Sequence, residues 1–467
     1  MPRISRRTFL SLAGAATVVC GCGGKAVIPG NGSSTLLAFS DIHFNPFYTK
    51  DSSVFTALNT ADVSEWEGIF ENSGSTVSST WGADTTYPLL KQALASVRSN
   101  LGNSEVVIYT GDLLGHQIPS LYATASGIAN PTNAAIAAFT NKTAQFVMQQ
   151  IRAAVKSIPV VFALGNCDSY TGYGPDSTFL ASTADTFYSS MLNGITDHQE
   201  FLTTFKSAGY YSVELFQKQL MVIGLNTILC SPLITPLPPA SAVNPQFAWL
   251  DQQLARAQAA GQKVWIVMHV PVGGYLSATA ASADSNGQIP SAQMMWVPAY
   301  QTSFLEIVAK YPGLISMLIA GHTHMDEYRL MMPGYALEIA PGISPLFGND
   351  PAYKMFTLDL NTFIPGDYSA VKRSLAAASP SQFASYYTFT EAYGTPEYST
   401  EYLEKLFPTL ATDPVQQARF RQTTIQATIR ATPSPTRHGR STGAALGTCQ
   451  SRESWRRRIP IDEGWRT

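Results

Sequence analysis

The sequence has little charge. Only 13% of its 467 residues are Asp, Glu, Lys or Arg, and the formal net charge is −2, whereas soluble domains usually carry about 25% charged residues. A chain this close to neutral has no basic field that would attract polyanions, so nucleic acid is excluded as a partner. Wholesale disorder is also excluded, because 45% of the residues are hydrophobic and can bury a large core.

Cysteine is also scarce. Five cysteines are too few and too scattered for a disulfide framework or a Cys-rich zinc site. Cys20 and Cys22 fall within the first thirty residues, so at most one disulfide can form among the other three, Cys167, Cys230 and Cys449. The seven histidines therefore carry most of the evidence for a site.

No segment is long and apolar enough to span a bilayer. The apolar run at 9–20 is shorter than the roughly twenty residues that a membrane helix needs. Arg6 and Arg7 precede this run and resemble a twin-arginine export signal, which carries folded proteins across the membrane. An ordinary secretory signal is the alternative.

The segment at 19–24 resembles a lipoprotein processing site, with Cys22 as the residue that would carry a lipid anchor. Cleavage without lipidation is the alternative. We therefore expect residues 1–34 to be an export signal followed by a tether. The expected location is the periplasm or another part of the cell envelope, or outside the cell.

From residue 35 the sequence alternates between short apolar strands and helices. Predicted strands over 35–40, 106–110, 159–164, 263–268 and 314–320 each end at side chains that can bind a metal. In α/β sheets the carboxyl ends of strands are where sites are built. The residues at these ends are Asp41 and His43, Asp112, Asn166 and Cys167, His269, and His322 and His324.

These strand ends form five blocks: D-x-H, GD, GNCD, a lone His and GHTH. Their order resembles the calcineurin-like metallophosphoesterases, whose blocks are D-x-H, GD, GNH-[DE], H and GHxH. The resemblance covers about residues 36–360 and implies an α/β fold, the four-layer α/β/β/α sandwich of that family. A glycine precedes Asp112, Asn166 and His322, and we expect it to let the backbone turn sharply there.

The resemblance also implies a centre of two divalent metal ions. Asp41, His43 and His324 would hold one ion, Asn166, His269 and His322 would hold the other, and Asp112 would bridge them. Nitrogen and oxygen donors of this kind suit zinc, which we favour, and also iron or manganese. Two such ions polarise a phosphoryl ester and acidify a water, so we expect a phosphoester to be hydrolysed by a metal-bridging hydroxide.

One residue departs from the family pattern. Cys167 stands where most members have a histidine that polarises the phosphate and protonates the leaving group. A neutral thiol is a weak donor and cannot carry the positive charge of an imidazolium. Three interpretations follow. Another group has taken over the role of the histidine, or the protein is slow or inactive, or Cys167 is itself a metal ligand or regulatory thiol.

We favour the first interpretation, with His116 as the general acid. The segment at 111–116, GDLLGH, resembles the GDxxxH form of the acid sphingomyelinase-like branch. The alternative is that His116 only orients a metal ligand. Resemblance to this branch favours a phosphodiester substrate, sphingomyelin-like or nucleotide-like. The alternatives are a phosphomonoesterase or polyphosphatase of the same fold, and a catalytically weak, metal-loaded binding protein of the envelope.

The expected domain organisation has three parts after the signal. A metallophosphoesterase domain covers 35–365, a helical C-terminal extension covers 366–431, and a tail that we expect to be disordered covers 432–467. Within the extension, the sequence predicts a helix over 399–407 that Pro408 stops, because proline cannot continue a helix.

Overall fold

The structure is a computed structural model that describes residues 33–234, 236–282, 291–332, 334–376, 382–410 and 412–424. The predicted export signal, the Cys22 anchor site and the tail over 432–467 lie outside these ranges. Within the described ranges, no helix is long and apolar enough to cross a membrane.

Six strands form the first sheet, in the order β12-β11-β10-β1-β2-β3. β1, β2 and β3 run parallel, and their register places Phe39, Tyr109 and Phe162 side by side at the carboxyl ends. Because these strands end level, the residues that follow them meet at one edge of the sheet. The strands are β1 (Ser33–Phe39), β2 (Val107–Tyr109), β3 (Val160–Phe162), β10 (Ala352–Asp359), β11 (Ile364–Lys372) and β12 (Ala384–Thr388).

The second sheet has the order β4-β5-β6-β7-β9-β8. β6 and β7 are parallel neighbours with Val267 opposite Ile319, so the segments that carry His269 and His322 leave the sheet at the same edge. The strands are β4 (Tyr211–Leu215), β5 (Leu220–Gly224), β6 (Lys263–Val267), β7 (Ile315–Ala320), β8 (Glu327–Met332) and β9 (Tyr335–Ile339).

The two sheets pack face to face. The Tyr211 ring lies 4.8 Å from the Phe162 ring, between centroids, and its hydroxyl donates to the Phe162 carbonyl at 2.8 Å. Trp265 Nε1 donates to the Phe363 carbonyl at 2.8 Å. All of these side chains are buried, so the interface between the sheets is the centre of the hydrophobic core.

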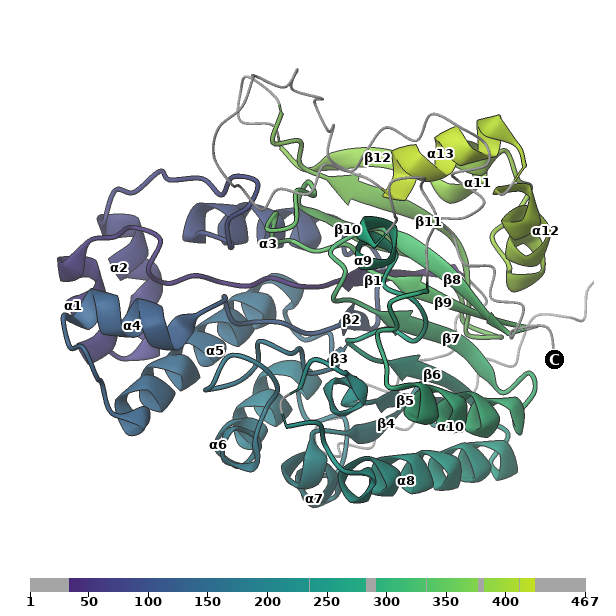
Figure 1. The fold of residues 1–467 in the computed structure, drawn as a ribbon, viewed down its shortest axis with the longest axis horizontal. Coiled ribbons are helices and arrows are strands. Elements are labelled where there is room, and N and C mark those ends of the chain that lie inside the picture. Colours follow the sequence, from purple (N-terminus) through teal and green to yellow (C-terminus); the bar gives the residue numbers. More distant parts are fainter. Residues whose placement is uncertain are drawn as a thin grey trace, which may run out of the picture.

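Helices cover the outer sides of the sheets. In Figure 1, α8 and α10 lie along the second sheet, while α3 and α5 lie beside the first. This arrangement confirms the expected four-layer α/β/β/α sandwich. The helices of this body are α1 (Ser52–Thr60), α2 (Trp66–Asn72), α3 (Tyr87–Ser99), α4 (Ile118–Ser126), α5 (Asn133–Val155), α6 (Ser177–Phe187), α7 (His198–Ala208), α8 (Ala240–Ala259), α9 (Leu276–Ala281) and α10 (Pro298–Ala309), with short turns η1 (Val63–Glu65), η2 (Tyr188–Leu192) and η3 (Thr227–Cys230).

The C-terminal segment begins as part of the first sheet. β11 crosses the expected boundary at residue 365, and β12 pairs with β11, so the first part of the predicted extension is strand and not helix. The helices α11 (Phe389–Tyr393), α12 (Thr400–Leu410) and α13 (Pro414–Thr424) follow. In Figure 1 they gather beside β11 and β12. The division of the chain into domains stays a prediction.

The expectation that Pro408 stops the helix after residue 407 is wrong. α12 continues to Leu410 with Pro408 inside it, and Leu403, Leu406 and Leu410 are buried. Proline removes one backbone hydrogen bond. We attribute the continuation to burial of the last leucine, which favours keeping the final turn.

A buried ion network joins both sheets to the C-terminal segment. Lys354 of β10 is fully buried, with its Nζ 2.9 Å from Asp326 Oδ1 and 2.6 Å from Glu338 Oε2 of β9. Tyr387 of β12 donates to Asp326 Oδ2 at 2.6 Å, and the hydroxyl of Tyr398 donates to Glu338. The lysine therefore holds two buried carboxylates that lie on the second sheet or in the loop leading into it.

Lys354→Met should strongly destabilise the fold. The substitution leaves two carboxylates buried without a counter-charge, and breaking a buried pair in this way costs about 3–5 kcal/mol. Urea unfolding measures the change. Lys405→Met is the matched control, because Lys405 forms an exposed ion pair with Glu401 and should leave the free energy of unfolding nearly unchanged. Equal effects of the two substitutions would contradict this reading of the network.

Candidate metal centre

The residues after the strands adopt unusual backbone conformations. Five of the predicted ligands have positive φ although none is glycine: Asp41 (50°), His43 (45°), Asp112 (63°), His322 (74°) and His324 (61°). Such conformations each cost about 1–3 kcal/mol and concentrate at functional sites. Backbone hydrogen bonds between the two loops hold the first of them, since Asp41 donates to Gly111 at 2.9 Å and His43 donates to Asp112 at 3.0 Å.

Asp41, His43 and His324 form the first group of donors, whose ligand atoms lie within 4.8 Å of one another. Asp41 Oδ1 lies 3.7 Å from His43 Nε2 and 3.4 Å from His324 Nε2. The two Nε2 atoms lie 3.1 Å apart. Each Nδ1 faces a backbone carbonyl, that of Leu114 at 3.1 Å and that of Ser344 at 3.0 Å.

The hydrogen bonds of the first group leave acceptor atoms facing one another with no positive charge between them. If each Nδ1 carries the proton that its carbonyl accepts, both Nε2 atoms are lone pairs pointing at each other. Asp41 Oδ1 is buried and has no hydrogen-bond donor. Lone pairs and a bare carboxylate oxygen in one buried place repel one another, and a divalent cation bound to all three removes that repulsion. This group therefore fits a metal ion.

Asp112, His269 and His322 form the second group. His269 Nδ1 faces the Thr110 carbonyl at 2.8 Å; if Nδ1 carries the proton that this carbonyl accepts, Nε2 is a lone pair. That Nε2 lies 3.2 Å from Asp112 Oδ2, 3.1 Å from His322 Nδ1 and 3.0 Å from Asn166 Oδ1. Oxygen and nitrogen atoms thus converge a second time, and the Asn166 amide oxygen lies among them.

Asp112 belongs to both groups. Its Oδ2 lies 3.3 Å from His43 Nε2 and 3.2 Å from His269 Nε2, while its Oδ1 accepts from the Cys167 backbone N–H at 2.6 Å. Burial raises the pKa of Asp112, but the neighbouring His269 and His43 lower it well below the usual range. For Asp41, burial raises the pKa and His324 and His43 lower it, to about 2. Both carboxylates are therefore ionised at neutral pH.

The glycines before the ligands act in two ways. Gly111 adopts a positive φ of 106°, as the predicted sharp turn requires. Gly165 and Gly321 do not; instead, a Cβ at Gly165 would overlap the Asp112 carboxylate, and one at Gly321 would overlap Ser40 Oγ. These two positions need glycine because neighbouring groups approach the backbone closely.

Asp168 is a site residue to which the sequence analysis assigned no role. Its buried carboxylate accepts hydrogen bonds from the backbone N–H groups of Gly165 at 2.8 Å, Leu113 at 2.8 Å and Asp112 at 3.1 Å. It therefore ties the second block to the third. Burial and the charge of Asp112 raise its pKa to about 6. The signal was present in the sequence, because Asp168 occupies the [DE] position of the GNH-[DE] block.

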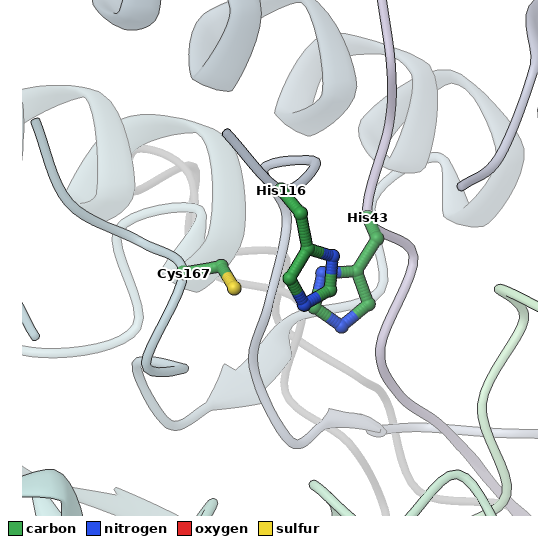
Figure 2. Close-up of side chains that lie close together, drawn as sticks. All are labelled: His43, His116 and Cys167. Atoms are coloured by element: carbon green, nitrogen blue, oxygen red, sulfur yellow. The ribbon is translucent and has the colours of Figure 1, made fainter. Parts of the chain in front are cut away.

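His116 lies against the first group. Its ring stacks on that of His43, with centroids 4.4 Å apart and planes 25° apart. Its Nδ1 lies 2.9 Å from Asp84 Oδ1, and its backbone N–H donates to Asp84 Oδ2 at 2.7 Å. Burial lowers the pKa of His116, but the Asp84 carboxylate outweighs burial and raises it to about 9. Figure 2 shows the Cys167 sulfur directed toward the His116 ring.

Asp84 is a functional residue that the sequence does not reveal. Nothing in the spacing of the sequence pairs its carboxylate with a histidine 32 residues away. Only the folded chain shows that Asp84 orients His116, in the way that carboxylates orient catalytic or metal-binding histidines.

Nitrogen and oxygen donors arranged in two groups around a shared carboxylate suit a pair of divalent ions, and such pairs act on phosphoesters. The fold and the site together thus define a protein of the metallophosphoesterase class with a candidate centre for two divalent ions. Comparison of the sequence with protein families gives the same class: residues 34–326 match the calcineurin-like phosphoesterases, and the chain belongs to this family.

The chain is similar to several named phosphodiesterases. Sphingomyelinase phosphodiesterase D of Dictyostelium discoideum is 28% identical over 296 residues, which are 60% of this chain and 58% of that protein. Cyclic GMP-AMP phosphodiesterase SMPDL3A of Rattus norvegicus is 26% identical over 356 residues, covering 70% of this chain and 71% of its own. A solved dimetal phosphatase from Danio rerio is 13% identical, with a TM-score of 0.40, and the match covers 75% of this chain and 98% of that one. The match to the Dictyostelium protein covers less than two thirds of that protein's length.

Proposed function

We propose that this protein hydrolyses a phosphodiester at a centre of two divalent ions. Asp41, His43 and His324 would hold one ion, Asn166, His269 and His322 would hold the other, and Asp112 would be shared between them. One observation carries the proposal: Asp112 Oδ2 lies within 3.3 Å of an imidazole Nε2 from each group. We favour zinc, because imidazole and carboxylate donors suit it, over iron or manganese.

His116 would supply a proton to the substrate next to the ions. When bound, the ions polarise the phosphoryl oxygens and lower the pKa of a nucleophilic water. His116 protonates the leaving oxygen from Nε2, because its Nδ1 is held by Asp84. With a pKa raised to about 9, His116 carries that proton at neutral pH. The Cys167 thiol is a much weaker donor, so His116 takes the role.

The substrate class rests on the similar proteins. Their names describe phosphodiesterases of sphingomyelin and of cyclic GMP-AMP, which supports a sphingomyelin-like or nucleotide-like diester. A phosphomonoesterase or polyphosphatase of the same fold is the rival within this class. Cys167 favours a second candidate, a catalytically weak, metal-loaded binding protein.

Turnover of bis-p-nitrophenyl phosphate should exceed turnover of p-nitrophenyl phosphate, with zinc, manganese and iron each tested alone. The release of nitrophenolate measures both reactions. Faster turnover of the monoester would favour the phosphomonoesterase. Two bound metal ions without turnover of either substrate would favour the binding protein.

His116→Ala should lower kcat for the diester by about 100-fold or more, since general acid catalysis contributes about 10²–10⁴. Cys167→Ala should cost far less. The wild-type rate should fall as pH rises through about 9, where His116 loses its proton. In Asp84→Asn the carboxylate no longer raises the pKa of His116, so this fall should move to lower pH. Equal, small losses in His116→Ala and Cys167→Ala would exclude His116 as the acid.

We also infer that the protein is exported, to the periplasm or another part of the cell envelope. Arg6 and Arg7 before the apolar run at 9–20 support this. Replacing both arginines with lysine should leave the unprocessed chain in the cytoplasm of a host with a twin-arginine pathway, as cell fractionation would show. Cys22→Ser should release processed protein from the membrane fraction if Cys22 carries a lipid. Normal export of the lysine variant would contradict the inference.

A further inference from the structure

Three donor atoms lie together beside the two groups of ligands. His43, His116 and Cys167, here called the thiol cluster, offer two imidazole nitrogens and one sulfur within 4.8 Å of one another. Figure 2 shows the three side chains converging, with the His116 ring over that of His43. His43 is a member of both the thiol cluster and the first group of ligands.

Hydrogen bonds orient every member of the thiol cluster. Asp84 holds His116 Nδ1 at 2.9 Å and the Leu114 carbonyl holds His43 Nδ1 at 3.1 Å, so the Nε2 atoms are the available donors. A carboxylate on the far nitrogen of a histidine is typical of metal ligands, because it sets the tautomer and strengthens the donor. The Asn166 amide donates from Nδ2 to Cys167 Sγ at 3.4 Å, which orients the sulfur.

One side of the thiol cluster is open to solvent. The side chain of His116 is 33% exposed, whereas His43 and Cys167 are buried. An ion from solution can therefore reach the cluster at His116. Because Cys167 stands where the family has histidine, this place offers a sulfur ligand in a centre otherwise made of nitrogen and oxygen donors.

We propose that the thiol cluster binds a soft divalent cation, such as cadmium or excess zinc, and that this binding inhibits the enzyme. Thiolate and imidazole ligands select such ions. On binding, the Cys167 S–H bond and the His116 Nε2–H bond break, a sulfur–metal and a nitrogen–metal bond form, and both protons leave to solvent, with no change of oxidation state. His43 Nε2 can bind only one ion, so the soft ion competes with the ion of the first group. It also occupies His116 Nε2.

The inhibition rests on the proposed function, but the binding does not. The test therefore has two separate measurements on the full chain loaded with manganese. Titration with cadmium is followed by the ultraviolet charge-transfer absorption of a thiolate–cadmium bond, and in parallel by diesterase activity. The variant is Cys167→Ser. The control is Cys230→Ser, because Cys230 is likewise free and buried but belongs to none of the donor groups within the described residues.

The wild type and Cys230→Ser should both develop the absorption and lose activity over the same range of cadmium. Cys167→Ser should lack this absorption and should need about tenfold more cadmium or more for the same fractional inhibition. His116→Ala, which keeps the thiol, should weaken cadmium binding by a similar factor. Every variant keeps all of its other cysteines, so a difference between Cys167→Ser and the wild type is due to Cys167.

Absorption that persists unchanged in Cys167→Ser would overturn the proposal, as would its loss in Cys230→Ser alone. If Cys167→Ser does not fold, unchanged cadmium affinity in His116→Ala would overturn it instead. Cadmium absorption without any diesterase activity would support the binding site and reject the proposed function. Diesterase activity without a Cys167-dependent absorption would support the proposed function and reject the binding site.

Discussion

The position of one carboxylate oxygen organises the site. Asp112 Oδ2 lies between His43 Nε2 of the first group and His269 Nε2 of the second. Those histidines come from different sheets, so the oxygen stands at the edge where the two sheets meet. Asp168, Gly165 and the Cys167 backbone N–H all act on this carboxylate or on the loop that carries it.

The loops around this oxygen are held in costly conformations by the rest of the fold. Positive φ at five ligands is stable only because hydrogen bonds and packing outweigh the strain. The same rigidity keeps the ligand nitrogens and two ionised carboxylates close together, and lone pairs repel one another wherever no proton lies between them. Cation binding would relieve that repulsion, which is a physical reason for a metal centre to hold its ligands this tightly.

The sequence predicts the structure best at the ends of the strands, where the candidate ligands lie. Each of the five blocks lies directly after a strand, and the level ends of β1, β2 and β3 bring Asp41, Asp112 and Asn166 to one edge. The sequence predicts the C-terminal segment less well. β11 and β12 extend the first sheet where helix was expected, because pairing with β10 supplies hydrogen-bond partners that no local pattern reveals. α12 likewise runs through Pro408 because its last leucine is buried.

The sequence by itself determined the class of the protein: the order of the ligands, their chemistry and the replacement of histidine by Cys167 are all local features. Only the tertiary structure decided which side chains act on one another. Asp84 meets His116, and Lys354 meets Glu338, through contacts between segments that are distant in the chain or in different sheets. The identity of the ligands can be read from short motifs, because the residues of one motif are neighbours in the chain. The orientation of the side chains, their pKa values and the sharing of His43 between two groups of donors depend on distances that exist only after the two sheets pack.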